Sequence, residues 1–245
     1  MKFSGKVAMI TGAGVGIGRA VALCMAEEGA DLVLLDIQSQ TLEELKKELS
    51  RFPVRVFTAV CDVADQAAVD AAVADAAAAL GKIDILVNNA ALWRSYVPFG
   101  EETAELWQKF MNINVMGVYY CTHAVLDGML QRGFGRIINV ASIAGVYGNA
   151  NMVCYSATKG AVIAMTRALA KEVSAKGVLV NAVSPGSVSD SSDRDIDAFQ
   201  PSELAFMGRT GTDRENAALI CFLASEEASY ISGQNIQIDG CRKRM

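Results

Sequence analysis

The sequence has little histidine, proline or tryptophan. Its 245 residues include one histidine, four prolines and two tryptophans. The single histidine, His123, cannot build a histidine-rich metal site and leaves little material for a Ser-His-Asp triad, so we interpret it as a packing residue. The six cysteines lie at least 20 residues apart, which excludes CxxC pairs and zinc-knuckle spacings. We therefore expect reduced thiols, a cytoplasmic location and no bound metal.

Long apolar runs and clustered positive charge are also missing. No stretch approaches the roughly 18 uninterrupted apolar residues of a membrane-spanning helix, since even the alanine-rich run 67–80 contains Asp70 and Asp75. The N-terminus shows no signal-peptide pattern. The net charge is -5, and we interpret the only basic cluster, Arg242 to Arg244, as a solvated tail. These features predict neither a membrane nor a nucleic-acid partner.

Apolar residues are abundant, and their arrangement indicates the fold class. They make up 52% of the chain, and the mean hydropathy is +0.27. Short apolar runs of the kind that form buried strands alternate with longer segments of helical periodicity. The runs cover residues 7–10, 32–35, 54–60, 83–87, 137–140, 178–183 and 236–238. This alternation predicts an α/β fold in which helices cover both faces of a parallel sheet, within one domain spanning residues 1–245.

Two helical segments and one loop add local detail. Asp65 is a candidate N-cap, and the apolar residues after it share one helical face at Val69, Ala72, Val73, Ala76 and Leu80. The helix expected after residue 155 has a face of small residues at Ala157, Ala161, Ala164 and Ala168. That face fits core packing as well as it fits an oligomer interface. Residues 185–207 predict a long loop of the kind that often acts as a lid.

A glycine-rich turn follows the first expected strand and opens the first helix. Its sequence is Thr11-Gly12-Ala13-Gly14-Val15-Gly16-Ile17-Gly18. Glycine lets the backbone approach a pyrophosphate, and free N–H groups at the helix N-terminus attract the anion. A bare packing turn is the alternative, but the strand–turn–helix context favours a dinucleotide.

Acidic residues end the second and third expected strands. Asp36 lies 24 residues after Gly12, where a carboxylate accepts hydrogen bonds from ribose hydroxyls and repels a 2′-phosphate. Ile37 follows and offers no positive charge. This pair predicts NAD and disfavours NADP, unless Asp36 is merely a solvated strand end. Asp62 is in a position to contact the adenine or to be solvated in the same way.

A second group of polar residues follows the fifth expected strand. Ser142 comes directly after this strand, and Tyr155 lies 13 residues later. Tyr155 and Lys159 share a helix face at positions i and i+4. A cation near the phenol favours phenolate over a phenol whose pKa is ordinarily about 10. Tyr155 is therefore a candidate general acid or base, although a solvated surface pair is the alternative.

Together these residues resemble the short-chain dehydrogenase/reductase family over essentially the whole chain. The matching motifs, in order, are residues 11–18 (TGxxxGxG), Asp62-Val63, Asn88-Asn89-Ala90, Asn114, Ser142, Tyr155 with Lys159, Pro185-Gly186 and Ile238-Asp239-Gly240. The resemblance implies a Rossmann-type, doubly wound sheet of about seven parallel strands in three α/β/α layers. It also implies a homo-tetramer or dimer.

The resemblance implies roles for individual residues as well. Ser142 would polarise the substrate oxygen and Tyr155 would exchange its proton. Lys159 would hold the nicotinamide ribose and tune Tyr155, while Asn114 would position a water. The implied cofactor-binding residues are Gly12, Gly14, Val15, Gly16, Ile17, Gly18, Asp36, Ile37, Asp62, Val63, Asn89, Ala90, Tyr155, Lys159, Pro185, Gly186, Val188 and Ser189. The chain departs from the usual family pattern at Ala91, Ser189 and Cys241.

The implied substrate pocket is more open to interpretation. Its candidates are Trp93, Ala144, Tyr147, Met152 and Phe199, with a substrate loop at about residues 186–208. Each candidate is also compatible with ordinary core packing. The loop carries Asp190, Asp193, Asp195 and Asp197. These carboxylates would repel a phosphate or carrier-protein thioester, unless they form a solvated surface.

We therefore expect an NAD-dependent oxidoreductase that transfers hydride between NAD(H) and a secondary alcohol or ketone, cyclic, aromatic or hydroxysteroid-like. The enzymatic alternative is a 3-oxoacyl thioester reductase, which predicts NADPH and a basic pocket rim. The alternative outside enzymes is a non-catalytic NAD-binding sensor or scaffold, which has no need of Asn114, Ser142, Tyr155 and Lys159.

Overall fold

Seven parallel strands form the centre of the computed structural model, which describes residues 1–94, 96–189 and 195–243. They are β1 (Val7–Thr11), β2 (Asp31–Asp36), β3 (Val56–Val60), β4 (Ile85–Asn88), β5 (Gly135–Val140), β6 (Val178–Pro185) and β7 (Asn235–Ile238). Their order across the sheet is β3-β2-β1-β4-β5-β6-β7. Every apolar run read as a strand forms one, so the predicted doubly wound α/β fold is confirmed.

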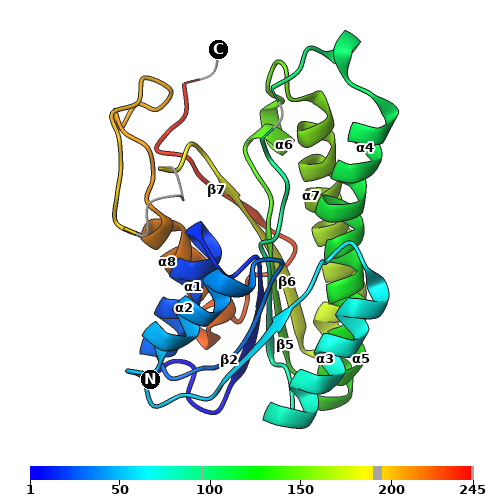
Figure 1. The fold of residues 1–245 in the computed structure, drawn as a ribbon, viewed down its shortest axis with the longest axis vertical. Coiled ribbons are helices and arrows are strands. Elements are labelled where there is room, and N and C mark those ends of the chain that lie inside the picture. Colours follow the sequence, from blue (N-terminus) through cyan, green and yellow to red (C-terminus); the bar gives the residue numbers. More distant parts are fainter. Residues whose placement is uncertain (95, 190–194, 244–245) are drawn as a thin grey trace.

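Helices cover both faces of the sheet (Figure 1). One face carries α1 (Gly16–Glu27), α2 (Ser39–Leu49) and α8 (Asp213–Ala224). The other carries α3 (Gln66–Leu80), α4 (Ala104–Met111), α5 (Gly117–Arg132) and α7 (Val153–Val173). The short helix α6 (Ala144–Tyr147) packs against α7. Short 3-10 turns occupy Phe99–Glu101, Ser174–Lys176 and Glu226–Ala228, and a π-helical turn, Asn112–Met116, joins α4 to α5.

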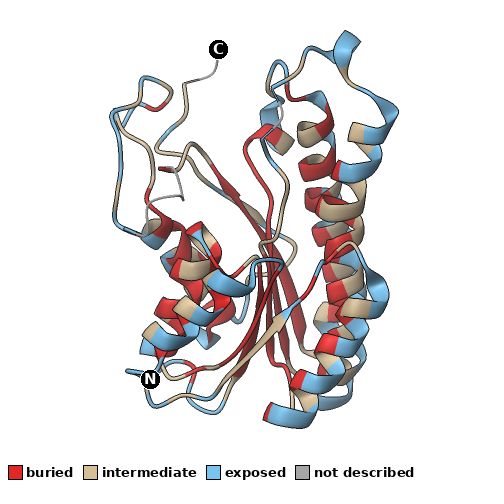
Figure 2. Cartoon of the chain, in the orientation of Figure 1, coloured by how far each residue is buried: buried red, intermediate tan, exposed pale blue. Residues whose placement is uncertain are grey.

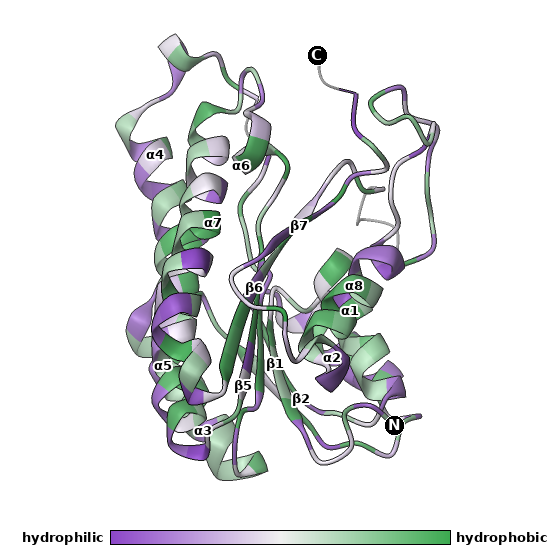
Figure 3. Cartoon of the chain, turned by 180° about the vertical axis from the view of Figure 1, so that it is seen from behind, coloured by the Kyte–Doolittle hydropathy of each residue, from purple (hydrophilic) through white to green (hydrophobic). Residues whose placement is uncertain are grey.

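The central strands are buried on both faces, which accounts for the apolar excess of the sequence. Ala8 and Ile10 of β1 pack into the core beneath α1, whereas Val7 and Met9 pack into the core on the opposite face. Because neighbouring side chains of a strand point to opposite faces, each core receives alternate residues. Figure 2 shows the central strands as continuously buried, and Figure 3 shows hydrophobic residues along them and along the helices that cover them.

The helix expected after Asp65 forms as predicted. The Asp65 side chain caps α3 by accepting hydrogen bonds from the backbone N of Ala67 and Ala68 at 2.9 and 3.2 Å. The predicted apolar face is buried at Val69, Ala72, Ala76 and Leu80 and half-buried at Val73. Within the described part of the chain, no helix is both long and apolar enough to cross a membrane.

The small-residue face of α7 is turned largely outward. Ala157, Ala164 and Ala168 are exposed, and Ala161 is half-buried. Packing within this chain therefore does not account for the face.

The C-terminal segment differs from the solvated tail that we expected. The backbone N of Lys243 donates to Leu204 O at 2.9 Å, and Phe206 N donates to Cys241 O at 2.9 Å. This pairing holds Arg242 against the loop after β6, so the tail interpretation is wrong for Arg242 and Lys243, while Arg244 lies outside the described residues.

Two aspartates of the acidic loop, Asp195 and Asp197, lie within the described residues. Asp190 and Asp193 lie outside the described residues. Asp197 accepts from Arg214 Nε at 2.6 Å, which offsets its charge. The Asp195 carboxylate accepts from the backbone N of Asp197 at 3.0 Å. The described portion of the loop is therefore less negative in effect than its composition suggests.

Candidate active site

The glycine-rich turn joins β1 to α1 where the order of strands reverses, at the carboxyl edge of the sheet. Such switch points are the usual ligand crevices of open α/β folds. Gly12 and Gly16 have φ of 60° and 58°, a region that side chains disfavour. A Cβ on Gly18 would lie 2.1 Å from Gly12 O. No side chain caps the N-terminus of α1, so its free N–H groups suit the phosphates of a dinucleotide.

Two side chains lock this turn to the end of β4. Asn89 Nδ2 donates to the carbonyl oxygens of Thr11 and Gly12 at 3.0 and 2.9 Å. Thr11 Oγ1 accepts from the backbone N of Asn89 and Ala90, each at 3.0 Å. A Cβ on Gly12 would approach Ala90 Cα to 2.9 Å. The predicted cofactor residues Gly12, Asn89 and Ala90 are thus brought together. The Thr11 hydroxyl stabilises this arrangement through its two hydrogen bonds, a role that sequence reasoning did not single out.

Asp36 ends β2 beside the same turn. Its Oδ2 accepts from the backbone N of Gly14 at 2.8 Å, and its Oδ1 accepts from Gln38 N at 3.0 Å. The residue is 8% exposed, whereas the neighbouring Ile37 is 65% exposed. The Asp36 carboxylate is therefore fixed at the edge of the turn, next to the exposed and uncharged side chain of Ile37.

The residues after β3 and β6 complete the predicted cofactor group. Asp62 is exposed, while Val63 is buried against Gly117, where a Cβ would lie 2.8 Å from Val63 Cγ2. After Pro185, the Gly186 backbone N donates to Ile238 O at 2.9 Å. Val188 and Ser189 are held by a parallel bridge to Gly211. All of these positions follow the carboxyl ends of strands.

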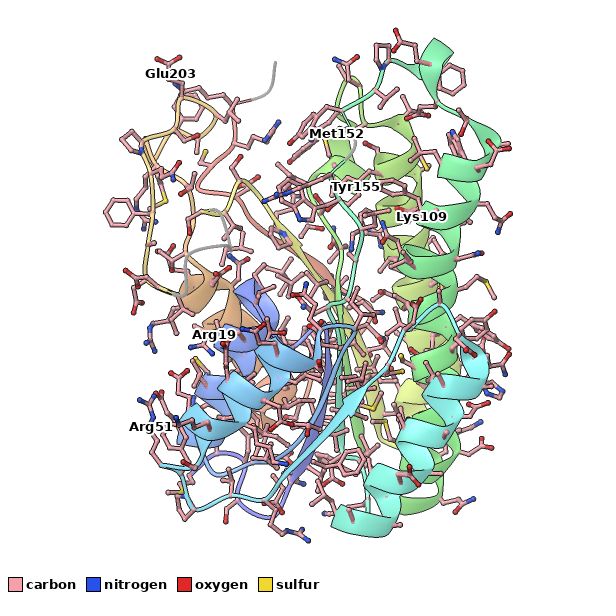
Figure 4. All side chains as sticks on the ribbon, in the orientation of Figure 1. Arg19, Arg51, Lys109, Met152, Tyr155 and Glu203 are labelled. Carbon is pink, nitrogen blue, oxygen red and sulfur yellow. The ribbon has the colours of Figure 1, made fainter. Side chains whose placement is uncertain are left out.

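Ser142 and Tyr155 meet at the carboxyl end of β5. Ser142 Oγ accepts from Ala144 N at 3.1 Å. Burial raises the pKa of the Tyr155 phenol above its ordinary value of 10, and a hydrogen bond to Ser142 acts in the opposite direction. The Tyr155 ring also makes an edge contact with buried Phe110, with ring centroids 6.4 Å apart. Figure 4 shows Tyr155 and Met152 at the same end of the chain segment that forms α7.

Lys159 is fully enclosed one turn further along α7. Its Nζ donates to Val140 O at 2.7 Å and lies 5.9 Å from the Tyr155 ring centroid. Burial lowers the pKa of this lysine to about 8. The expected lowering of the Tyr155 pKa is not met: burial, the largest influence on this phenol, raises its pKa. Two desolvated groups of this kind are typical of functional sites.

Asn114 lies at the centre of the π-helical turn Asn112–Met116, and π turns within helices occur frequently at functional sites. Its Oδ1 accepts from Leu92 N at 2.8 Å. Its Nδ2 donates to Leu92 O at 2.9 Å and to Thr158 Oγ1 at 3.2 Å. The Thr158 hydroxyl in turn donates to Tyr155 O at 2.8 Å. The amide is thus engaged with the protein and links the segment after β4 to the helix of Tyr155.

Glu102 is a further residue that sequence reasoning missed. The α7 N-terminus has no side-chain cap from its own flanking residue. Instead, Glu102 Oε1 accepts from the backbone N of Cys154 at 3.2 Å, and its Oε2 accepts from Trp107 Nε1 at 2.9 Å. Since Glu102 lies 52 positions before Cys154, no local capping pattern could have revealed this contact.

The predicted substrate residues fall into two groups. Ala144 and Met152 are buried, while Tyr147 is partly exposed and its hydroxyl donates to the Gln237 side chain. Trp93 is 41% exposed beneath the Arg94 guanidinium, 4.8 Å from its ring centroid.

Phe199 is placed apart from these residues. It is 59% exposed, and it lies under Arg209 at 5.3 Å in a hollow lined by residues of α8 and the loop before it. In Figures 1 and 3 this loop lies opposite α6 and α7. Tyr96, in contrast, lies near enough to Tyr155 to raise the pKa of its phenol.

Comparison with known proteins identifies the family. The family model described as Enoyl-(Acyl carrier protein) reductase matches residues 12–241. The 2-dehydro-3-deoxy-L-rhamnonate dehydrogenase (NAD(+)) of Sphingomonas sp. (strain SKA58) is 37% identical, over 98% of this chain and 96% of its own. The 3-oxoacyl-(acyl-carrier-protein) reductase FabG of Thermotoga maritima is 39% identical over 98% of both chains. The crystal structure of NAD+-bound xylitol dehydrogenase has a TM-score of 0.91 at 32% identity, covering 98% of this chain and 100% of that one. This chain belongs to the short-chain dehydrogenase/reductase family and is an oxidoreductase.

Proposed function

We propose that the protein is an NAD-dependent dehydrogenase that interconverts a secondary alcohol and its ketone. The observation that carries the proposal is the meeting of Ser142 and Tyr155 above the enclosed ammonium of Lys159, at the strand edge that also holds the glycine-rich turn. When bound, the nicotinamide accepts or donates the hydride. A non-catalytic NAD-binding scaffold would not need these three side chains.

Residues of this chain transfer the proton to and from the substrate oxygen. With its raised pKa, Tyr155 holds its proton at neutral pH and can donate it to a developing alkoxide during ketone reduction. Ser142 donates to the same substrate oxygen and polarises it. In the direction of oxidation, Tyr155 takes the alcohol proton as phenolate, a state that the nearby Lys159 ammonium favours. Because both ends of the Asn114 amide are already engaged, its side chain acts by positioning, and any water it helps to hold is held by the backbone of the π turn.

The preference for NAD rests on Asp36. Its carboxylate is fixed beside the glycine-rich turn, where it can accept from ribose hydroxyls, and the residue that follows it is uncharged. Two of the compared proteins, the rhamnonate dehydrogenase and the xylitol dehydrogenase, carry NAD in their names.

For the substrate, we favour a compact secondary alcohol, cyclic, aromatic or polyhydroxylated. Trp93, Tyr96 and Tyr147 offer exposed aromatic side chains to such a substrate, and Tyr96 lies near Tyr155. The two dehydrogenases named above act on polyhydroxylated compounds according to their names. A hydroxysteroid remains a substrate compatible with aromatic walls, but no other feature supports it.

A 3-oxoacyl thioester reductase is the second candidate. The 39% identity to the Thermotoga maritima reductase favours it. So does the pairing of Asp197 with Arg214, which removes part of the negative charge that we expected to repel a thioester. Preference for NADPH over NADH would select this candidate.

Two further features complete the proposal. The exposed small-residue face of α7 supports a homo-tetramer or dimer, which light scattering after size-exclusion chromatography would measure. The six cysteines have free thiols, and we place the enzyme in the cytoplasm.

The decisive experiment is Tyr155→Phe, which removes only the phenolic hydroxyl. We expect NADH binding, measured by nicotinamide fluorescence, to stay within about threefold of wild type. Turnover of a panel of secondary alcohols should fall by at least about 100-fold, as expected for loss of a general acid/base. Retention of most activity in the variant would exclude the proposed proton transfer. Absence of turnover in the wild-type enzyme with every alcohol and thioester would favour the scaffold.

A further inference from the structure

The C-terminal segment of the chain lies opposite α6 and the start of α7, the helix that carries Tyr155. Gly240 and Cys241 have φ of 63° and 59°, and the segment then pairs antiparallel with the loop after β6 through the bridge between Ala205 and Arg242. Figure 1 shows this segment and loop facing α6 and the start of α7. Figure 4 marks the same two sides, with Glu203 on the loop and Met152 opposite.

The Arg242 side chain contacts the connection between α6 and α7. Its Nη2 donates to Asn149 Oδ1 at 3.4 Å. Asn149 belongs to the connection between α6 and α7, and its backbone N donates to Ser156 Oγ at 3.2 Å. Its Nδ2 also points to Met152 Sδ at 3.8 Å. The guanidinium is therefore tied to the residues that immediately flank Tyr155.

Arg242 is half-buried but has no ion pair in the described part of the chain. Two nearby arginines of the described part of the chain are paired: Arg209 with Glu215 at 2.6 Å, and Arg214, at the start of α8, with Asp197 at 2.6 Å. Asp239 borders the same small hollow as Arg242, yet it is not within ion-pair distance, and its Oδ1 accepts from Cys241 N at 3.1 Å. One long contact to a neutral amide leaves most of the five guanidinium donors unused.

We propose that Arg242 binds a carboxylate of the substrate, so that the preferred substrates are hydroxy acids and oxo acids. The proposal rests on the proposed function, because it places the anion in the site that Tyr155 serves. A planar guanidinium forms two parallel hydrogen bonds to a carboxylate, and these would replace the weak contact with Asn149. The Asn149 amide has a second N–H besides the one directed at Met152 Sδ, and this N–H can donate to the same anion. Arg242 is thus a specificity-determining residue, while the hydride and proton steps stay with the residues described above.

Matched acids and esters test this proposal by binding. The enzyme–NAD+ complex, which cannot reduce a ketone, is titrated calorimetrically with 4-oxopentanoate and 4-acetylbenzoate, and with the methyl ester of each, which keeps the ketone and removes the charge. We expect each acid to bind at least about 10-fold more tightly than its ester, as for a hydrogen bond to a charged group. Arg242→Gln should abolish this preference and leave ester binding within about threefold. Arg242→Lys should retain part of it, since the charge remains without the fork.

Lys243→Gln is the matched control. It removes the same charge from the next residue, whose Nζ lies over the Phe206 ring at 5.5 Å, and it should leave the preference intact. In steady-state assays, Arg242→Gln should raise KM for the acids with kcat changed by less than about threefold. Wild-type complexes that bind acid and ester equally, or a preference that survives in Arg242→Gln, would overturn the proposal. An acid preference without turnover of any ketone would instead overturn the proposed function and leave the anion site standing.

Discussion

Asp36→Asn tests cofactor selection with the smallest change in shape. The carboxylate is 8% exposed and accepts from Gly14 N at 2.8 Å and from Gln38 N at 3.0 Å. Asparagine keeps one of these acceptors and removes the negative charge. We therefore expect the variant to fold and to lose most of its discrimination against a 2′-phosphate.

The size of the effect follows from the Coulomb energy at the turn. A phosphate monoester carries close to two negative charges at pH 7. Two unit charges about 4 Å apart repel by about 4 kcal/mol at an effective dielectric constant of about 20. Because Ile37 is 65% exposed and the site edge is open to water, we take about half of this value. About 2 kcal/mol corresponds to roughly a 30-fold change in the ratio of NADPH to NADH dissociation constants.

The assay is a fluorescence titration of wild type, Asp36→Asn and Asp31→Asn with NADH and NADPH. Asp31 begins the same strand at the opposite edge, where it pairs with Arg55 at 2.6 Å, so Asp31→Asn should leave the ratio unchanged. One lost backbone hydrogen bond should lower the stability of Asp36→Asn by about 1 to 2 kcal/mol, or roughly 2 to 8 °C in Tm. Equal affinities in the wild type, or a ratio that moves less than about threefold in Asp36→Asn, would refute the reasoning.

Two further variants probe the helix that carries Tyr155. Gly145→Ala would bring a Cβ within 2.5 Å of Lys159 C and 2.7 Å of Gly160 N, so it should cost about 1 to 3 kcal/mol of folding free energy and reduce kcat. The control Gly100→Ala has open space around the new methyl group and should change neither quantity. Equal denaturant midpoints for the two variants would contradict the close approach of α6 to α7. Lys159→Met tests the lowered pKa of Lys159, about 8 against the ordinary 10.5. Because this lysine binds its proton more tightly in the unfolded chain, it reduces wild-type stability by a constant amount below pH 8. The lost stability is recovered as the pH rises toward 10.5. From pH 7 to pH 9.5 the free energy of unfolding of the wild type should therefore rise by about 2 kcal/mol relative to that of Lys159→Met. The control Lys171→Met, at an exposed lysine, should show the same pH dependence as the wild type. A stability difference between wild type and Lys159→Met that is independent of pH would show that burial does not shift the pKa of Lys159.

Much of the fold could be predicted because its determinants are local. Buried strands need continuous apolar residues, and the segments that end at Asp36 and Val140 show this directly in the sequence. The Asp65 cap also acts within its own turn, so a pattern of neighbouring residues identifies it. The glycine-rich turn belongs to the same class, since its backbone angles and close approaches restrict the residue type at each position.

The candidate site could be predicted in part. The spacing of Tyr155 and Lys159 placed both residues on one helix, but it could not give the sign of the pKa change. That sign depends on how far water is excluded around the phenol, and burial is a property of the packed chain. In the same way, the engagement of both ends of the Asn114 amide required the position of Leu92.

The sequence by itself determined the order of strands and helices, the family, and the residue types at the cofactor turn, because each depends on composition and spacing along the chain. The tertiary structure decided which distant groups meet. Glu102 caps a helix 52 positions away, and Arg242 leaves the expected solvated tail to reach Asn149 across 93 positions. Phe199 and Tyr147 were assigned to one pocket, yet Phe199 lies in a hollow with residues of α8, whereas the Tyr147 hydroxyl contacts Gln237 of β7. Contacts of this kind depend on the path of loops through space, on which periodicity and local spacing carry no information.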